Sequence, residues 1–581
     1  MGVRKDFLPV VFISFGLLIF SLTADMARMR RGGFMSDEAT YFAMAMSIAQ
    51  ERDLLYTKDD LIRIFDKFPV GPQGLFLKKG KDGKLFYAKS FAYPLFVAPF
   101  FAIFGYKGFF VFHSLLMFLV LTAGYFFYRD SGSPTLISIS FVFASVCWIY
   151  FWWMTSEVFL FSVTFLALFF WLYKYGNPNS PPFKFLKEKT SDIVSAILFG
   201  IATFAKPPLI IFAGFFSLFY FFKRKFFYSI LLFLIVLLTS FSFFGINYLL
   251  TGDPNYMGGE RKSFYFHWPY EKEEYKFENM GYLMTSENYW QRFYLTPEMF
   301  FSNIFYYFFG RYSGMAWYYF PAFLSLIIFI LRKKKEFWEF FVLAGAFLII
   351  LVMITLSPDN YYGGGGTIGN RYFMGLYPAF FFIGRGKGLK SVLFEWFMAL
   401  FFLSSIFFNP LYASSFPGTH VKTFPFKFIP PEFTLVETYS TNTNPNAFRI
   451  PFGDGPLYYL YFMNDNFYKR EGMGFWTVGR ETCEMMVEVT KECKGIQIKV
   501  TNNPGKILNK VIVKVNGRKE KITMYQSEMK VLKFYGRGFK FKKHFLFHVK
   551  IHSKTSYNPY FSEKENLDNR NLGVFVEIMP I

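Results

Sequence analysis

The chain has 581 residues, of which 53% are hydrophobic and 24% aromatic, while only 18% are charged. Soluble domains rarely combine so much apolar and so little charged sequence, so the composition excludes an ordinary soluble enzyme. The apolar residues form blocks of roughly 20, the length that crosses the hydrocarbon core of a bilayer. The net charge of +22 does not indicate nucleic-acid binding, because many basic residues lie in short loops between these blocks. We therefore predict a polytopic membrane protein.

Eleven segments are apolar and long enough to be predicted as membrane-spanning helices. In chain order they are residues 7–25, 108–128, 134–151, 157–174, 192–204, 207–222, 226–250, 312–331, 336–356, 371–385 and 391–408. The first block has no small-residue cleavage site, which predicts a retained helix and not a removed signal peptide. The apolar stretch from Phe91 to Gly105 is short and carries Pro94 and Pro99, so we predict a helix at the outer surface.

Loop charges orient the predicted helices in an inner or plasma membrane. With the N-terminus in the cytoplasm, basic clusters such as Lys223–Lys225 and Arg332–Lys335 fall inside, whereas a crossing by Phe91–Gly105 would place them outside. Arg28, Arg30 and Arg31 are a local exception. The predicted outer loops are residues 26–90, 251–300 and 357–370, and everything after about residue 409 is extracytoplasmic.

Residues 1–410 form the predicted membrane domain, and residues 411–581 a second, extracytoplasmic domain with alternating apolar residues. Val511, Val513 and Val515 lead into Asn516-Gly517, a dipeptide typical of a type I′ β-hairpin. About 170 residues of this kind predict an antiparallel β-sandwich.

Two features of this domain could suggest a metal or a disulfide. Apolar side chains at alternate positions of residues 539–551 share one strand face, and His544, His548 and His552 share the other. Histidines two and four apart on a strand are spread along the sheet and no nearby carboxylate is expected to complete a site, so we favour a solvated strand face over a metal site. Cys483 and Cys493 could form a disulfide in an oxidising compartment, but the sequence alone does not decide this.

The first predicted outer loop contains Asp37-Glu38 within the segment Ser36–Tyr41. Ser36 can cap a helix running to about Arg52, and acidic residues are common at helix starts. The pair therefore indicates either a helix start or a catalytic carboxylate.

Further motifs lie on the same predicted side of the membrane. They are Ala88-Lys89-Ser90-Phe91-Ala92-Tyr93-Pro94-Leu95, Thr155-Ser156-Glu157, Phe204-Ala205-Lys206-Pro207-Pro208, and Gly369-Asn370-Arg371-Tyr372 followed by Tyr377-Pro378. With Asp37-Glu38 after one N-terminal helix, residues 7–410 resemble the C-type (GT-C) glycosyltransferases, such as the protein O-mannosyltransferases and the lipid A aminoarabinose transferases. The prolines after Lys89 depart from the family pattern, because they are displaced and one is missing. Asn569–Gly573 resembles part of an extra β-domain of some bacterial members.

The resemblance implies an enzyme that transfers a hexose or pentose from a polyprenyl-phosphate donor to an acceptor hydroxyl on a lipid, glycan or protein. Asp37 would be the general base, with Glu38 beside it. Fixed cations stabilise a departing phosphate, a role implied for Lys89, Lys206 and Arg371. Tyr41 and Tyr372 would complete the substrate site. A single base without a second nucleophile implies inversion. No metal ligands are predicted, although the acidic pair could bind a divalent metal.

Each candidate cation also has a structural interpretation. Lys89 and Lys206 could be interfacial lysines that extend toward the lipid head groups. Arg371 could pair with Asp359 in the predicted loop that precedes it.

Other residues of the predicted outer loops have two interpretations as well. The glycines at 363–366 either bring backbone N–H groups to a phosphate or form a flexible loop. Glu38 either holds Asp37 in place or caps the helix. For Glu157, and for His267 beside Trp268, we favour a structural role.

Two functions of other classes compete with glycosyl transfer. One is transport of lipid-linked glycans, but transporters usually show internal repeats and broken helices at the membrane midplane, and the sequence shows no repeat. The other is a non-catalytic envelope scaffold that presents the β-domain.

Overall fold

The computed structural model describes residues 5–25, 33–34, 37–176, 187–283, 294–438, 450–451, 458–505, 507–563 and 565–581, so Ser36 and the three arginines at 28–31 lie outside the described residues. The chain divides into two compact units. Unit 1 consists of Met1–Phe293, Tyr307–Leu356 and Tyr361–Pro417, and unit 2 of Tyr294–Tyr306, Ser357–Asn360 and Gly418–Ile581. The predicted domain boundary at residue 411 lies a few residues before Gly418, and unit 2 also takes in two short segments of the preceding chain.

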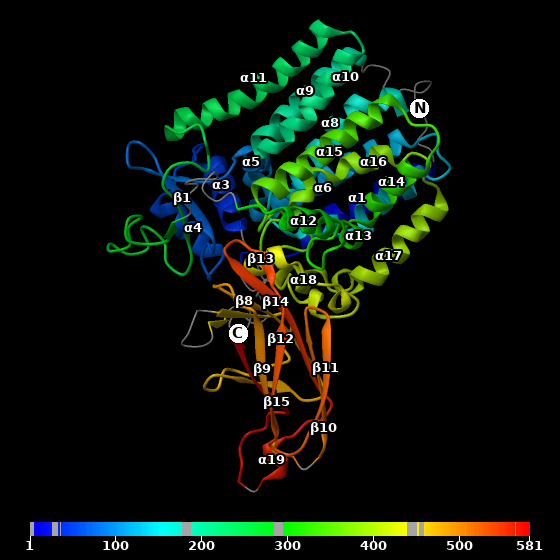
Figure 1. Cartoon of the computed structure of the whole chain (residues 1–581). Coiled ribbons are helices and arrows are strands. Elements are labelled where there is room, and N and C mark those ends of the chain that lie inside the picture. The colour runs from blue at the N-terminus through cyan, green and yellow to red at the C-terminus, as the bar shows by residue number, and fades with distance from the viewer. Residues whose placement is uncertain are drawn as a thin grey trace. The chain divides into compact units, whose positions relative to one another are not determined.

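Apolar helices make up most of unit 1, and α9, α10 and α11 lie side by side within it (Figure 1). The longer helices are α1 (Leu8–Thr23), α5 (Ala92–Phe104), α6 (Gly108–Phe127), α7 (Pro134–Phe143), α8 (Glu157–Gly176), α9 (Glu188–Ala205), α10 (Ile210–Phe222), α11 (Phe226–Thr251), α14 (Phe320–Leu331), α15 (Phe337–Leu356) and α17 (Leu389–Phe407). Shorter ones are α13 (Met315–Tyr318), α16 (Tyr377–Ile383) and α18 (Pro410–Ser415), while most of α12 (Pro297–Phe309) belongs to unit 2. Among the described residues, six helical stretches, or seven with one bent pair, have the length and composition of membrane spans.

Three of the eleven predicted spans are interrupted in the structure. Residues 134–151 form α7 and the 3-10 helix η3 (Val146–Trp152), which meet at a bend of 65°. Residues 312–331 form α13 and α14, and residues 371–385 form the 3-10 helix η5 (Arg371–Gly375) and the seven-residue α16. Proline stands in the first turn of α7, α14 and α16, where its missing N–H favours a new helix start.

The predicted surface helix is α5, and it folds back against α6. Gly105 has a positive φ of 58° between the two helices. The Phe101 and Phe109 rings lie 6.2 Å apart, whereas residues eight apart in one straight helix are separated by about 12 Å along its axis. Ala92–Phe127 is therefore a helical hairpin.

A small antiparallel sheet joins the first two predicted outer loops. Its order is β2-β1-β3-β4, with β1 (Leu75–Lys79) and β2 (Leu85–Tyr87) from the first loop and β3 (Arg261–Phe264) and β4 (Tyr282–Leu283) from the second. Helices α3 (Glu38–Gln50) and α4 (Lys58–Lys67) belong to the same region of the chain. The Phe76 backbone N–H donates to the Thr40 hydroxyl over 2.9 Å, which ties α3 to β1.

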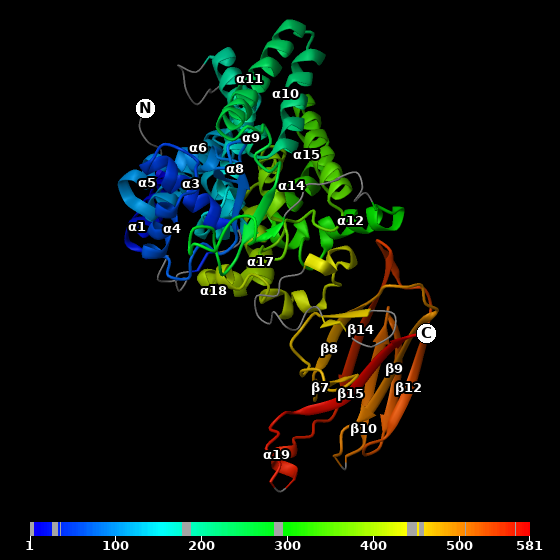
Figure 2. The ribbon, with the colours of Figure 1, turned by 90° about the vertical axis from the view of Figure 1, so that its left-hand side faces the viewer.

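Unit 2 contains two antiparallel sheets (Figure 2). One has the order β11-β10-β14-β8-β6-β5 with β13 paired to β14, and the other β12-β9-β15-β7. The strands are β5 (Ile450–Pro451), β6 (Tyr458–Phe462), β7 (Phe475–Val478), β8 (Thr482–Val489), β9 (Gly495–Asn502), β10 (Asn509–Val515), β11 (Arg518–Met524), β12 (Met529–Tyr535), β13 (Phe539–Phe541), β14 (His544–Ser553) and β15 (Leu572–Pro580), with the short helix α19 (Pro559–Ser562) before β15. Alternate apolar residues of both sheets, such as Val487, Phe547, Ile498 and Val574, form one buried core.

The predicted hairpin in unit 2 is confirmed. Strands β10 and β11 pair with Val515 opposite Arg518, and Asn516 and Gly517 both have positive φ, as a type I′ turn requires. The single strand predicted for residues 539–551 is wrong, because the chain turns at Lys542, which has a positive φ, and separates β13 from β14.

The prediction that the histidines of residues 544–552 lack a nearby carboxylate is also wrong. His548 Nε2 lies 2.8 Å from Glu484 Oε1, and His544 bonds Glu488, both on the neighbouring strand β8. Strand pairing brings these groups together from about 60 positions apart, which a search along the sequence does not find. All three cysteines are free, so the structure has no Cys483–Cys493 disulfide.

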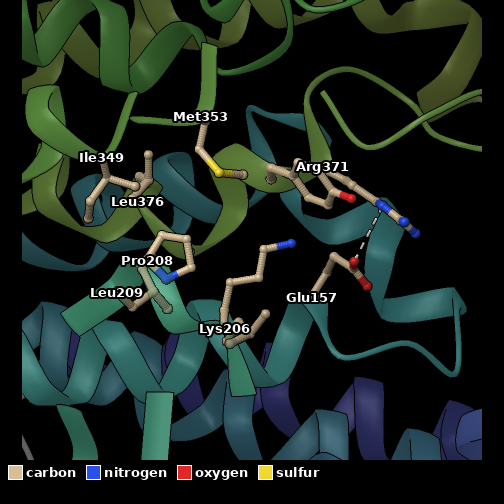
Figure 3. Close-up of a pocket in the computed structure, with 11 residues that line it drawn as sticks. Glu157, Lys206, Pro208, Leu209, Ile349, Met353, Arg371 and Leu376 are labelled. Carbon is tan, nitrogen blue, oxygen red and sulfur yellow. Dashed lines mark ion pairs between the residues drawn. The ribbon is translucent and has the colours of Figure 1, made fainter. Parts of the chain in front are cut away.

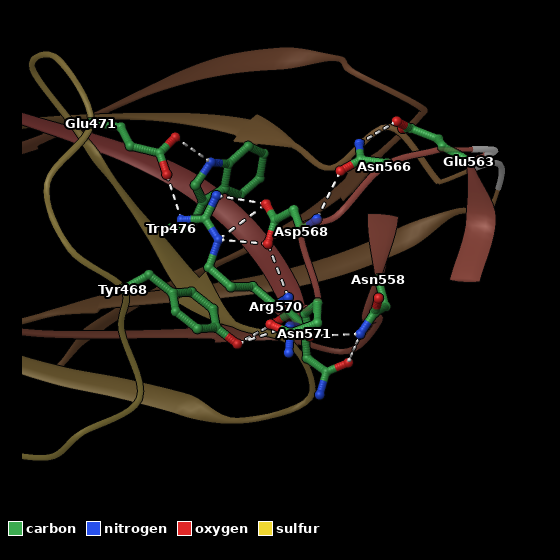
Figure 4. A network of polar contacts seen from close by, with 10 residues as sticks. Tyr468, Glu471, Trp476, Asn558, Glu563, Asn566, Asp568, Arg570 and Asn571 are labelled. Carbon is green, nitrogen blue, oxygen red and sulfur yellow. Dashed lines mark hydrogen bonds and ion pairs between the residues drawn. The ribbon is translucent and has the colours of Figure 1, made fainter. Parts of the chain in front are cut away.

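The Asn569–Gly573 motif stabilises the loop that precedes β15 (Figure 4). Arg570 donates to Asp568 through Nε and Nη2, at 2.9 and 2.7 Å, and also bonds Glu471. Trp476 Nε1 donates to the same glutamate over 3.2 Å. These bonds give the motif a structural role within unit 2.

Candidate functional site

Asp37, Lys89 and Arg371 meet in unit 1. Asp37 Oδ2 lies 3.0 Å from Lys89 Nζ and 3.4 Å from Arg371 Nη1, and the three side chains are only 11%, 13% and 10% exposed. They come from the start of α3, the segment after β2, and η5, which are far apart in the sequence. Although Asp37 is the N-cap residue of α3, its side chain makes no capping hydrogen bond. The helix-start interpretation therefore does not account for this carboxylate.

Burial and charge act in opposite directions on Asp37. Removal from water raises the pKa of its carboxyl, but the positive charges of Lys89 and Arg371 outweigh this effect and hold the pKa well below its usual range. Burial lowers the pKa of Lys89, while the Asp37 charge opposes that shift. The free protein thus holds Asp37 as an ionised and weakly basic carboxylate.

Gly363 makes room for Arg371. The Arg371 backbone N–H donates to the Tyr362 carbonyl over 3.0 Å, which places the arginine side chain against the next residue. A Cβ atom at residue 363 would lie 2.6 Å from Arg371 Nε, and the glycine has a φ of +103°. The glycine run therefore has a steric function at this position.

Glu38 and Tyr41 connect α3 to the segment that precedes α8. Glu38 Oε1 accepts a 2.6 Å hydrogen bond from the Met154 N–H, and the Tyr41 and Ser156 hydroxyls lie 3.1 Å apart. Glu38 therefore bonds the backbone before α8, whereas Asp37 pairs with the cations. Within the described ranges, no three His, Cys, Asp or Glu side chains form a group that could hold a metal.

Glu157, for which the sequence favoured a structural role, belongs to the cluster. Its Oε1 lies 3.7 Å from Arg371 Nε at the first turn of α8. The Arg371–Asp359 pairing considered from the sequence is not what the structure contains, since Asp359 pairs with Lys542 at 3.0 Å inside unit 2. His267 contacts Glu271 at 3.7 Å and the Tyr275 ring at 5.0 Å, in keeping with a structural role.

Lys206 and Tyr372 form the neighbouring part of the site. Lys206 ends α9 just before Pro207, and its Nζ lies 3.4 Å from the centre of the Tyr372 ring. Burial lowers the pKa of Lys206. Figure 3 shows its ammonium group pointing into a pocket that Glu157 and Arg371 also line. The remaining wall is mostly apolar and is formed by Leu160, Pro208, Leu209, Ile349, Met353 and Leu376.

Arg261 is a fourth cation that sequence reasoning missed. It begins β3, is buried, and lies with its guanidinium carbon 4.3 Å from the centre of the Phe76 ring, whose centre is 4.6 Å from Lys89 Nζ. Its charge also lowers the pKa of Asp37. Arg261 falls in the predicted outer loop 251–300, in a segment without a recognisable motif. Only the pairing of β3 with β1 reveals its position.

Several buried polar atoms around the cluster are unsatisfied. Among the residues that the structure describes, the following side-chain atoms are buried without a hydrogen-bond partner: Ser90 Oγ, Thr155 Oγ1, Glu157 Oε2, Arg261 Nε, Asn370 Nδ2 and Arg371 Nε. Buried polar groups normally have partners, so these atoms are open to water or to a polar ligand. Four cations against the two carboxylates Asp37 and Glu157 favour an anionic ligand.

The structure thus brings together Asp37, Lys89 and Arg371, and places Lys206 and Tyr372 at the adjoining pocket. Comparison with known proteins adds no family to this geometry: no family model, no curated protein and no solved structure matches the chain.

Proposed function

We propose that this protein is an inverting glycosyltransferase of the GT-C class, which moves a sugar from a polyprenyl-phosphate donor to an acceptor hydroxyl at the outer face of a membrane. The observation that carries the proposal is the buried Asp37 carboxylate between Lys89 and Arg371, beside two further cations and a partly apolar pocket. A polyprenyl phosphate has the matching chemistry, an anion attached to a long apolar chain.

In this proposal the membrane domain crosses the bilayer eleven times, with its N-terminus in the cytoplasm, and the two sheets of unit 2 form an extracytoplasmic β-sandwich. The basic loops support this orientation. The interrupted segments at 134–151, 312–331 and 371–385 would be broken crossings, which buried protein surroundings can tolerate.

The proposed reaction is one in-line displacement. The acceptor oxygen attacks the anomeric carbon, the bond from that carbon to the phosphate oxygen breaks, and the lipid phosphate departs with the electron pair. The hydroxyl proton passes to Asp37. Lys206, Arg371 and Arg261 stabilise the charge that gathers on the phosphate, and arginine suits bidentate phosphate contacts.

The ion pairs of Asp37 need a change before this residue can serve as a base. Lys89 and Arg371 contact the same oxygen of Asp37, and a donor phosphate offers them a second anion. As the phosphate draws these cations from Asp37, the pKa of the carboxyl rises toward its ordinary value. Donor binding and base activation are then one event.

The test is transfer of radiolabelled hexoses and pentoses from polyprenyl phosphates to envelope lipids, glycans and proteins by purified protein in nanodiscs. We expect transfer by wild type and by Asp66→Asn, which changes an exposed carboxylate of α4, and transfer reduced by a factor of about 10³ in Asp37→Asn. Equal transfer by Asp37→Asn would remove that residue from the base role. Flipping of lipid-linked glycan without sugar release would instead support the transporter, and neither activity the scaffold.

The orientation has its own test in intact cells. Cysteines introduced at Lys84 and Lys519, in a background without native cysteines, should react with an impermeant maleimide from outside. A cysteine at Lys334 should react only after permeabilisation. The reverse pattern would overturn the topology.

A further inference from the structure

A second concave site lies between the first and second predicted outer loops. This groove has a volume of about 570 Å³ and is lined by Lys58, Gly83 and Leu85 of the first loop and by residues 270–273 and 275–278 of the second. Tyr56 donates to the Pro269 carbonyl over 3.0 Å, and Lys79 pairs with Glu278 at 2.5 Å, so direct bonds fix both walls. The groove is therefore held in shape by contacts between the two loops of unit 1.

The charges that line the groove balance. They are three lysines and three glutamates: Lys58, Lys272, Lys276, Glu271, Glu273 and Glu278. A polyanion or a basic peptide would gain little from such a lining, because half of the charges would repel it. Ammonium and carboxylate groups do offer many donors and acceptors to a neutral ligand rich in hydroxyl groups.

Two tyrosines contribute aromatic rings to the groove. Tyr270 stacks on Tyr56 at 5.7 Å between ring centres and is 41% exposed, while Tyr275 lies half-buried within the same loop. The N–H of Tyr270 donates to the Tyr275 carbonyl over 3.1 Å, which holds the two residues together. A rigid aromatic ring beside polar groups provides an apolar face and a polar edge to a ligand of the same mixed character, such as a pyranose.

The groove also lies close to the Asp37 cluster. Leu85 lines it at the start of β2, and Lys89 follows just beyond the end of that strand. Even fully extended, this stretch of chain spans no more than about 13 Å. We infer that the groove binds a neutral oligosaccharide whose terminal hydroxyl reaches Asp37. That this oligosaccharide is the acceptor substrate rests on the proposed function, whereas its binding to the groove does not.

Binding is tested with purified full-length protein and labelled linear hexasaccharides of neutral glucan, mannan and galactan, without any donor. We expect at least one to bind, and Tyr270→Ala and Tyr275→Ala each to weaken binding about tenfold. Tyr275→Phe keeps the ring and should retain binding. Tyr282→Ala, a 65% exposed tyrosine of the same loop outside the groove, should have no effect.

The background variant Asp37→Asn separates this inference from the proposed enzyme activity. It should lose transfer and keep oligosaccharide binding, and in the active enzyme Tyr275→Ala should raise the acceptor KM without changing the donor KM. If none of the neutral hexasaccharides binds, or if a sulfated hexasaccharide binds more tightly than all of them through these tyrosines, the inference is overturned. Binding that survives while no donor is consumed would instead overturn the proposed function alone.

Discussion

Two arginines, one in each unit, are paired very differently. Arg570 in unit 2 makes bidentate hydrogen bonds to Asp568 and also bonds Glu471, so all three nitrogens of its guanidinium group have acceptors. Arg371 in unit 1 lies 3.4 Å from Asp37 and 3.7 Å from Glu157, and over the described part of the chain its buried Nε has no hydrogen-bond partner. Structural ion pairs satisfy their donors, whereas a ligand site leaves some open. This difference is consistent with the proposed ligand-binding role of Arg371, whereas Arg570 holds a loop.

Asp37→Asn is the substitution with the largest expected effect. Loss of the proposed base should reduce sugar transfer by a factor of about 10³. Because the carboxylate competes with phosphate for Lys89 and Arg371, the same variant should bind polyprenyl phosphate more tightly than wild type. Transfer is measured with labelled donor and affinity by equilibrium binding of the unglycosylated lipid phosphate.

The control for this prediction is Asp66→Asn, which should match wild type in both measurements. Weaker lipid phosphate binding by Asp37→Asn would mean that the carboxylate only orders the two cations. The proposed competition would then be wrong.

Exchanging the two arginines for lysine tests the comparison directly. Arg371→Lys keeps the charge but loses the planar fork, so we expect kcat/KM to fall about 100-fold with little change in Tm. Arg570→Lys should leave kcat/KM unchanged and destabilise unit 2 by about 1 kcal/mol, a small figure because this arginine is partly exposed. Equal effects of the two substitutions on activity would abolish the distinction between them.

The parts of this structure that the sequence predicts are those encoded locally. Asn516-Gly517 specifies its own turn, and apolar blocks such as Phe226–Thr251 specify long helices. Short motifs were enough to select Asp37 and Lys89 as candidates. They could not predict that the two side chains lie 3.0 Å apart.

The missed residues depend on pairing between distant segments. Arg261 reaches the site because β3 pairs with β1, and Glu488 reaches His544 because β8 pairs with β14. Glu157 could have been found from Thr155-Ser156-Glu157, yet its distance from Arg371 is set by the packing of α8 against η5. Register and packing are properties of the whole fold, so a single sequence shows neither.

Gly363→Ala should have an intermediate effect. The added methyl group would collide with Arg371, and the positive φ at this position is unfavourable for alanine. The arginine would move away from its position, so we expect the donor KM to rise about tenfold while the acceptor KM stays constant. The matched control is Gly132→Ala, where a Cβ atom meets nothing within 4 Å, and an equal change in that variant would contradict the steric argument.

The smallest expected effect is a difference between two pH profiles. In the free protein the cations hold the pKa of Asp37 well below its usual range, so the carboxylate stays ionised as the pH falls and the acidic limb of kcat/KM lies at low pH. Bound phosphate draws Lys89 and Arg371 away and raises that pKa, so the acidic limb of kcat, which reports the complex, should lie at higher pH. Both limbs come from initial rates at varied donor concentration, with Asp66→Asn as the matched variant. Coincident limbs would show that donor binding leaves the environment of Asp37 unchanged, and Asp37 would then be a fixed counter-ion of the phosphate site and not its base.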